Sequence, residues 1–445
     1  MSFSTLPFFN FIALFILLFL ALRKVVSQRL LLLAGSWAFY GFWSPGFLLL
    51  LVGASLLGHG AGLAIGARPG DRAHGRRWVA ATSVLLLCNL AFFKYLPVEG
   101  VTLPLAISFY TFEILSYVVD VHKGRVEARR SFTDTALFIA FFPHLIAGPI
   151  LRAGDFFRQL PTPGTAFTLS LENTAWALQR FVWGLVKKLL VSPCLSDVVD
   201  PVFADPASYS GARLAAAALF FSAQLYVDFS AYSDMALALG RFFGIRLPEN
   251  FNNPYFARNI QDFWKRWHMT LSSWLTDYMY TPLQLTRRIP TGTCLMITMG
   301  LCGLWHGAGS TFVVWGLFHG VLLVLYSRFQ HLRIPPVIMG LATYLLCTAG
   351  LVIFRAESLP EAGLALQHIG AFLAGHDNPG RWISLREGGL AFGLVALASM
   401  AYERGWHRIW GMFPPLLRGA LTAMGLWASL AFSFGGQKPF YYFIF

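Results

Sequence analysis

Two histidines of this chain lie where an ionisable side chain is costly. His306 occurs in the sequence Leu304-Trp305-His306-Gly307, inside an apolar run from Thr293 to Leu325. If this run is helical from Thr293, a rise of ~1.5 Å per residue places the imidazole ~20 Å along it, near the middle of a ~30 Å hydrocarbon layer. An ionisable group at that depth usually has a function. Together with His268, it predicts chemistry inside a membrane.

His268 ends a basic, aromatic stretch, Phe263-Trp264-Lys265-Arg266-Trp267-His268. Over Ile260–Tyr278 the helical period separates an apolar and aromatic face from a polar one. This pattern predicts one amphipathic helix that lies in an interface or dips into the protein from the cytoplasmic side. The apolar face holds Trp264, His268, Leu271, Leu275 and Tyr278.

Two carboxylates precede this region, in Tyr226-Val227-Asp228-Phe229-Ser230-Ala231-Tyr232-Ser233-Asp234. Because the segment is mainly apolar, Asp228 and Asp234 must pair, hydrogen-bond or face water. One interpretation is a satisfied polar network that fixes helix packing. The other is that the carboxylates line a wet path to the histidines.

The surroundings of His306 also allow two interpretations. Taken alone, a histidine on an apolar segment can be a core residue bonded to a backbone carbonyl. Gly303, Gly307 and Gly309 either let an extended substrate approach the imidazole or serve tight helix packing. Since a second histidine-bearing element precedes it by a short loop, we favour catalysis.

The composition identifies the class of protein that holds these residues. Of 445 residues, 56% are hydrophobic and 12% are charged, against ~25% charged residues in ordinary soluble domains. This balance predicts an all-α, polytopic integral membrane protein. The net charge of +13 does not indicate nucleic-acid binding, because the Lys and Arg residues stand in short loops, where they set topology and contact membrane lipids.

The order of apolar segments and basic loops predicts the topology. Five segments up to Val121 alternate across the membrane, with the loops at Arg68–Arg77 and Lys123–Arg130 on the cytoplasmic side. Phe132–Ile150 contains two prolines and predicts a re-entrant or broken helix. With later spans, roughly ten to twelve membrane segments result. The later spans are Ala175–Val191, Leu214–Phe243, Thr293–Leu325, Val337–Phe354, Gly389–Ala401 and Leu416–Phe434.

Other motifs give little chemistry. Glycines every fourth residue, as in Gly58, Gly62 and Gly66, predict close helix packing. The five cysteines are scattered without a CxxC pair and are interpreted as buried free thiols. We find no nucleotide-binding loop and no metal-ligand spacing, so we expect no metal and no bound cofactor.

Several linked motifs resemble the membrane-bound O-acyltransferase family, and within it the bacterial alginate O-acetylase branch. They are Ala223–Met235, Asn250-Phe251-Asn252-Asn253-Pro254-Tyr255, Asp262–Ser272, Gly303-Leu304-Trp305-His306-Gly307, Phe141–Ile150 and the aromatic end Pro439–Phe445.

The resemblance implies a reaction and roles for residues. It implies acetyl-CoA as a cytoplasmic acyl donor and a central funnel towards the opposite face of the bacterial inner membrane. His306 matches the essential histidine and would act as general base on the accepting hydroxyl. His268 matches the second histidine and would position the thioester or the acceptor. The substrate-binding candidates are Trp305, Trp264, Trp267, Lys265, Arg266, Asp228, Tyr232, Asp234, Asn253 and Tyr255, with Lys265 and Arg266 near the phosphates of coenzyme A.

The resemblance further implies one transferase domain over residues 1–445, with N-terminal helices (1–130), a catalytic core (131–330) and C-terminal helices (331–445). The acceptor would be an extracytoplasmic polysaccharide or a periplasmic partner of the SGNH type.

This chain departs from its relatives over Thr276–Arg288, which leaves the polymer, the donor and the partner surface open. A D-alanyl transferase acting on a teichoic-acid-type acceptor, or a transporter or flippase without covalent chemistry, are the alternatives.

Overall fold

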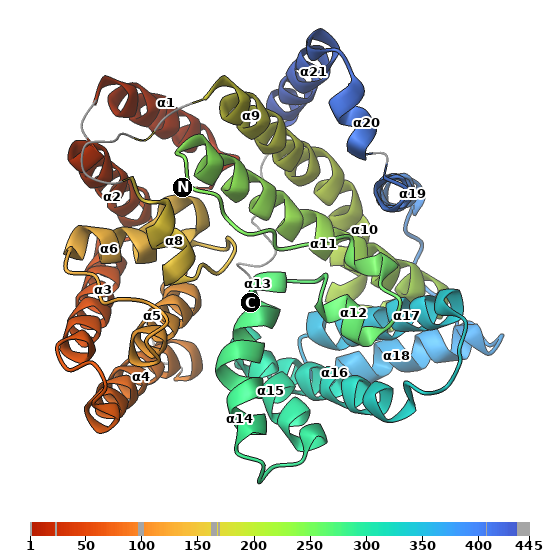
Figure 1. The fold of residues 1–445 in the computed structure, drawn as a ribbon. Helices are drawn as coiled ribbons and strands as arrows, with labels where there is room; N and C mark the ends of the chain where they lie inside the picture. Colours follow the sequence, from red (N-terminus) through yellow and green to blue (C-terminus); the bar gives the residue numbers. More distant parts are fainter. Residues whose placement is uncertain are drawn as a thin grey trace. The chain divides into compact units, whose positions relative to one another are not determined.

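The structure, a computed structural model, describes residues 2–22, 25–96, 102–161, 167, 170–405 and 407–433. Every regular element within these ranges is helical (Figure 1), as predicted. The aromatic end 439–445, which contributed to the resemblance, lies outside them. The chain divides into two compact units, Met1–Phe181 with Tyr232–Pro248, and Val182–Ala231 with Glu249–Phe445.

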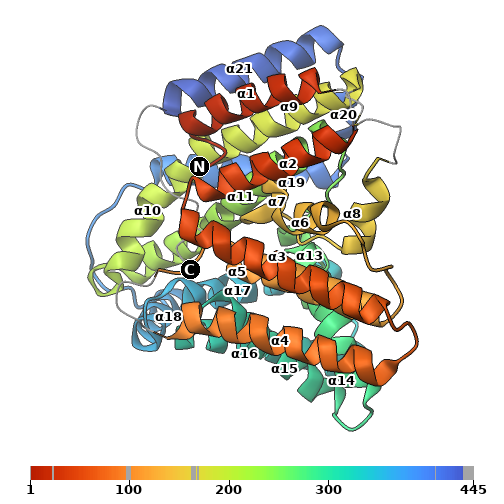
Figure 2. The same cartoon turned by 90° about the vertical axis from the view of Figure 1, so that its left-hand side faces the viewer.

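The first unit is built around close contacts of glycine-bearing helices. A methyl group added at Gly58 would lie 2.6 Å from Cγ2 of Ile114, and one at Gly62 would lie 2.6 Å from the hydroxyl of Tyr117. The small-residue spacing therefore packs helices, as predicted. Figure 2 shows α3, α4 and α5 side by side. The helices of this unit are α1 (Leu6–Ala21), α2 (Val25–Gly41), α3 (Pro45–Gly66), α4 (Arg72–Tyr95), α5 (Ile107–His122), α6 (Phe132–Ala140), α7 (Phe142–Leu145), α8 (Ala153–Gln159), and parts of α9 (Leu171–Val186) and α11 (Gly211–Phe242).

The predicted broken helix over Phe132–Ile150 is confirmed. Helix α6 ends at Ala140, the single turn α7 follows, and the chain then runs buried and non-helical. His144 holds this element: its Nδ1 lies 3.1 Å from Oε1 of Glu113, and its Nε2 lies 3.2 Å from the carbonyl of Phe138. Because a carbonyl only accepts, Nε2 carries a hydrogen and donates it.

The second unit contains the elements that carry both predicted histidines. Helix α15 packs along α16, and α16 also contacts α12 and α17. The elements are the π-helical η1 (Lys187–Val191), α10 (Ser192–Ala204), η2 (Pro206–Ser208), the first part of α11, η3 (Pro254–Phe256), α12 (Ile260–Trp264), α13 (Met269–Leu275), the π-helical η4 (Thr276–Tyr280), α14 (Thr281–Leu285), α15 (Thr291–His306), α16 (Ser310–Phe329), α17 (Pro336–Arg355), α18 (Leu359–Leu373), α19 (Arg386–Glu403), α20 (His407–Met412) and α21 (Pro415–Ser433).

The prediction of one helix over Thr293–Leu325 is wrong. Helix α15 ends at His306, Gly307 is extended, and α16 begins at Ser310. The turn lets α16 fold back along α15. The two backbones meet at Gly303 and Gly316, which have no side chains. A methyl group at Gly303 would overlap the carbonyl of Phe312, and one at Gly316 would overlap that of Met299. His306 is therefore the last residue of a helix and not its midpoint.

The single amphipathic helix predicted over Ile260–Tyr278 is also interrupted. Helix α12 ends at Trp264, and His268 adopts the left-handed conformation (φ 42°) before α13 begins. The N–H of Met269 donates to the carbonyl of Asn250 (2.9 Å), and the carbonyl of Arg266 accepts from the N–H of Asn252 (2.9 Å). These bonds use the backbone groups that a continuous helix would pair within itself.

Five helices among the described residues are long and apolar enough to cross a membrane: α3, α4, α11, α16 and α17. A sixth apolar helix, α1, is shorter. The total of ten to twelve segments stays a prediction.

The contact between α15 and α16 gives a first prediction. Gly303→Ala should lower the free energy of unfolding by ~1–3 kcal/mol, because the added methyl group overlaps backbone that has to move. Gly363→Ala on α18 is the control, since nothing lies within 4 Å of that position; it should be neutral or slightly stabilising. Thermal unfolding of the purified protein in detergent measures both, and equal melting temperatures would contradict the packing described here.

Candidate functional site

Three histidines line one buried cavity in the second unit. His268 is 1% exposed, His306 9% and His319 1%. The free space among the lining side chains is about 20 Å³, which admits about one water molecule. Around the histidines lie Leu225, Phe229, Tyr255, Phe263, Trp267, Trp315, Cys347, Leu351 and Phe354. The structure thus brings His268 and His306 together, as the sequence predicted, and adds a third histidine.

His306 lies within a cage of aromatic rings. The ring centroids of Trp305, Trp315 and Phe354 are 4.8, 5.1 and 5.3 Å from that of the imidazole, each nearly perpendicular to it. The glycines beside it serve packing, because Phe312 fills the space next to Gly303 and Gly307. As the last residue of α15, His306 lies at the negative end of the helix dipole, where an imidazolium is stabilised.

Hydrogen bonding fixes which nitrogen of His268 carries the hydrogen. Its Nδ1 lies 3.1 Å from Oδ1 of Asn250. The same oxygen accepts from the hydroxyl of Thr270 (2.9 Å) and from its N–H (3.4 Å), which sets the orientation of the amide. An amide oxygen only accepts, so Nδ1 donates and Nε2 carries the lone pair. Burial lowers the pKa of His268 to about 3, so the ring is neutral at physiological pH.

The tryptophans connect the histidines. The ring centroid of Trp305 lies 6.1 Å from that of His268 and 4.8 Å from that of His306. Trp267 lines the cavity and stacks on Phe263 at 5.8 Å. Trp264 is buried and lies 5.2 Å from the ring of His319.

Two of the other predicted substrate-binding residues make hydrogen bonds that hold the elements of the site together. Tyr255 presents its ring to the cavity, while its hydroxyl donates to the carbonyl of Ser222 (2.6 Å). Asn253 donates to the carbonyl of Ser399 (3.0 Å) and to Glu403 (3.1 Å), and so fastens the loop before α12 to α19.

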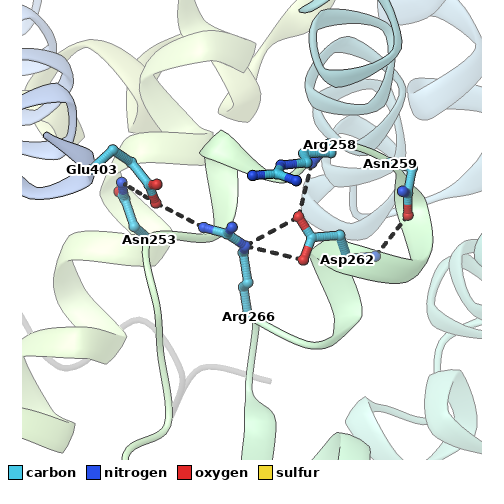
Figure 3. A network of polar contacts seen from close by, with 6 residues as sticks. All are labelled: Asn253, Arg258, Asn259, Asp262, Arg266 and Glu403. Atoms are coloured by element: carbon cyan, nitrogen blue, oxygen red, sulfur yellow. Dashed lines mark hydrogen bonds and ion pairs between the residues drawn. The ribbon is translucent and has the colours of Figure 1, made fainter. Parts of the chain in front are cut away.

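The two cations of the predicted basic stretch, Lys265 and Arg266, differ in their surroundings: Arg266 is paired and Lys265 is exposed. Arg266 bonds Asp262 through Nε (3.2 Å) and Glu403 through a terminal nitrogen (2.7 Å), as Figure 3 shows. Its charge is therefore balanced by two carboxylates. Lys265 is exposed and shares a surface pocket of about 430 Å³ with Arg258, a residue not predicted from the sequence.

Both predicted buried carboxylates are paired with cations. Asp228 accepts from Nζ of Lys188 at 2.6 Å, with both side chains at most 5% exposed. In the first unit, Asp234 accepts from Nε of Arg180 at 2.7 Å. Tyr232, also in the first unit, is buried and stacks on Phe3 at 4.8 Å. None of these three predicted residues lines the histidine cavity.

The sequence contained a signal for His319, which was not among the predicted site residues. His319 stands on an apolar helix one turn after Trp315, and an ionisable side chain in a candidate span indicates function by the same argument as for His306. Among the residues that the structure describes, no group of three or more His, Cys, Asp or Glu side chains is arranged to hold a metal ion.

Comparison with known proteins identifies the family. The sequence model of the membrane-bound O-acyltransferase family matches residues 78–351. The chain is 40% identical to the probable alginate O-acetylase of Azotobacter vinelandii over 381 residues, which cover 79% of this chain and 75% of that protein. It is 34% identical to the peptidoglycan O-acetyltransferase of Helicobacter pylori, over 76% of this chain and 73% of that protein. A teichoic acid D-alanyltransferase of Bacillus subtilis is 26% identical, over 51% of this chain and 59% of that protein.

The family match covers more than half of the chain, and relatives of about 40% identity extend over most of it. The chain therefore belongs to the membrane-bound O-acyltransferase family, in its alginate O-acetylase-like branch, and is an O-acyltransferase.

Proposed function

We propose that this enzyme transfers an acetyl group from cytoplasmic acetyl-CoA to a hydroxyl outside the cytoplasmic membrane. The observation that carries the proposal is the small, buried, aromatic cavity that His268 and His306 share. The names of the alginate and peptidoglycan relatives support O-acetylation of an extracytoplasmic polysaccharide, either directly or through a periplasmic partner of the SGNH type.

His306 is the general base of the proposed reaction. It takes the proton of the acceptor hydroxyl while the oxygen attacks the thioester carbon. The carbon–sulfur bond then breaks, and His306 gives the proton to the leaving thiolate, which departs as the thiol and restores the neutral imidazole. The position at the end of α15 supports this role, because the helix dipole favours the imidazolium formed in between.

His268 positions a reactant. Since Asn250 holds the hydrogen on Nδ1, the lone pair of Nε2 is available to accept a hydrogen bond from the acceptor hydroxyl. The neutral ring adds no positive charge beside His306, which therefore accepts a proton without repulsion from it.

The relatives support acetyl as the transferred group. The alginate O-acetylase and peptidoglycan O-acetyltransferase relatives are 40% and 34% identical over 79% and 76% of this chain, whereas the teichoic acid D-alanyltransferase is 26% identical over 51% of it. D-alanyl transfer is therefore the weaker candidate. A transporter without covalent chemistry does not fit an acyltransferase family.

The exposed pair Arg258 and Lys265 is the better candidate for the phosphates of coenzyme A. Both line one surface pocket and are exposed. Arg266 lines the same pocket, but its charge is paired with Asp262 and Glu403, so it fixes this region. Among the remaining sequence candidates, we assign substrate contact to Trp267 and Tyr255, which line the cavity, and support of the site to the paired aspartates.

We further propose that residues 1–445 act as one transferase domain in the bacterial inner membrane, with ten to twelve membrane segments and lipid contacts at the basic loops. The apolar helices and the family support a multi-pass membrane protein.

Replacing the general base should abolish transfer. We expect His306→Ala to lower kcat by ~10²–10⁴-fold, measured as transfer of labelled acetyl from acetyl-CoA in proteoliposomes at equal protein amount. His331→Ala, at an exposed histidine after α16, should leave the rate unchanged. Full activity of the His306 variant would exclude this residue as the base.

A carboxylate in place of Asn250 should change how the rate of transfer depends on pH, which tests the positioning role of His268. In Asn250→Asp, a negative charge about 3.1 Å from Nδ1 favours the imidazolium and raises the pKa of His268. At a pH below the raised pKa of His268, Nε2 is protonated and cannot accept a hydrogen bond from the acceptor hydroxyl. We therefore expect the variant to lose activity at lower pH and to regain it as the pH rises above this pKa. Rates between pH 6 and 9 test this, with Thr270→Val as the control that keeps Asn250. An unshifted profile would remove the positioning role of His268.

Removing the two exposed cations of the surface pocket should weaken donor binding and leave the chemical step unchanged. Arg258→Ala with Lys265→Ala should raise KM for acetyl-CoA ~10-fold through lost charge-assisted hydrogen bonds, with kcat unchanged. Arg266→Ala should instead lower the melting temperature, because it leaves Asp262 and Glu403 without this partner. If the double variant binds acetyl-CoA normally, the phosphates lie elsewhere.

A further inference from the structure

His319 is a buried polar group that the proposed roles of His268 and His306 do not use. It is 1% exposed on α16 and faces aromatic rings: Trp315 at 4.9 Å, Trp264 at 5.2 Å and Phe263 at 6.3 Å between ring centroids. No charged residue is among these contacts. An imidazole kept in such surroundings costs stability unless something hydrogen-bonds it.

The polar atoms of this corner lack partners within the described part of the chain. They are Nδ1 of His319 and the indole nitrogens of Trp264 and Trp315, each buried and without a hydrogen bond. Buried polar groups are nearly always paired, so three together require an explanation. Indole N–H groups only donate, so any ligand that satisfies them must bring an acceptor.

Trp315 also links this corner to the reaction centre. Its ring centroid lies 5.1 Å from that of His306 and 4.9 Å from that of His319. Trp315 and His319, both on α16, line the histidine cavity. The free space there admits about one water molecule, and a carbonyl oxygen is of similar size. The carbonyl oxygen of a thioester that enters this cavity is an acceptor of the kind that the unpaired donors require.

We propose that His319 and Trp315 donate hydrogen bonds to the acyl oxygen of the donor and stabilise the oxyanion of the transition state. This inference rests on the proposed acyl transfer. When the acceptor oxygen bonds to the acyl carbon, the carbonyl π electrons move onto the acyl oxygen. Nδ1–H of His319 and Nε1–H of Trp315 bond that oxyanion, and the electrons return as the carbon–sulfur bond breaks. Removing one such donor typically costs ~10²–10³-fold in kcat.

Three substitutions at position 319 separate this role from packing. The amide nitrogen of asparagine replaces Nδ1, that of glutamine replaces Nε2, and leucine has neither. We expect His319→Leu to lose ~10²–10³-fold in kcat with KM for acetyl-CoA within about threefold, and His319→Asn to retain most of the rate. His319→Gln should behave like the leucine variant. The melting temperature of His319→Leu should equal or exceed that of the unchanged protein, because an unpaired buried polar group is removed.

Trp315→Phe is the second variant, since it removes the indole N–H and keeps an aromatic ring; we expect a similar loss in kcat. His376→Leu, at an exposed position, is the control and should match the unchanged protein. All are measured as full-length protein in proteoliposomes with labelled acetyl-CoA.

The outcomes distinguish this inference from the proposed function. If the unchanged protein transfers acetyl and His319→Leu keeps its kcat within about threefold, the oxyanion role is wrong and the acetyl transfer stands. Equal losses in the Asn, Gln and Leu variants with lowered melting temperatures would assign His319 to packing and also overturn it. If the unchanged protein transfers a different acyl group, the proposed donor is wrong, and the same variants assayed with that donor test His319.

Discussion

The close approach of α15 and α16 is the contact on which the histidine cavity depends. It is possible because Gly303 and Gly316 have no side chains, so that each helix lies against a backbone carbonyl of the other. This approach requires α15 to end and the chain to turn back, which leaves His306 at a helix end. It also brings Trp315 on α16 against the imidazole. In hydrocarbon, where no hydrophobic force drives helices together, such van der Waals contact is a main source of helix association.

Ion pairs of the second unit hold elements in place. The partly exposed Arg266 joins Asp262 to Glu403 on α19, and the buried Lys188 pairs with Asp228. Pairing is expected, because an isolated charge in apolar surroundings is far costlier than a paired one. The polar groups around the cavity differ in kind: they are imidazoles and indoles, which form hydrogen bonds without a permanent charge.

One of these functional candidates, His268, has a left-handed backbone conformation. His268 takes its left-handed conformation because Asn250 and Asn252 bond the backbone on either side of it. The same asparagine fixes the tautomer through its side chain. One loop thus determines both where His268 points and which of its nitrogens can accept, a coupling that a continuous helix would not provide.

The sequence by itself determined the helical membrane class, the family and the two linked histidines. It also required that Asp228 and Asp234 pair, hydrogen-bond or face water. Composition, short motifs and the cost of buried charge are local properties, which is why the sequence alone carries them. Only the tertiary structure decided that α15 stops at His306, that α12 breaks before His268, and that His319 joins them. Apolar periodicity is the same for one long helix and for two helices folded back on each other. The partners of Arg266 and His144 were equally hidden, since Glu403 lies 137 residues from Arg266 and Glu113 lies on another helix from His144. Such pairs depend on packing between distant segments, which no local pattern records.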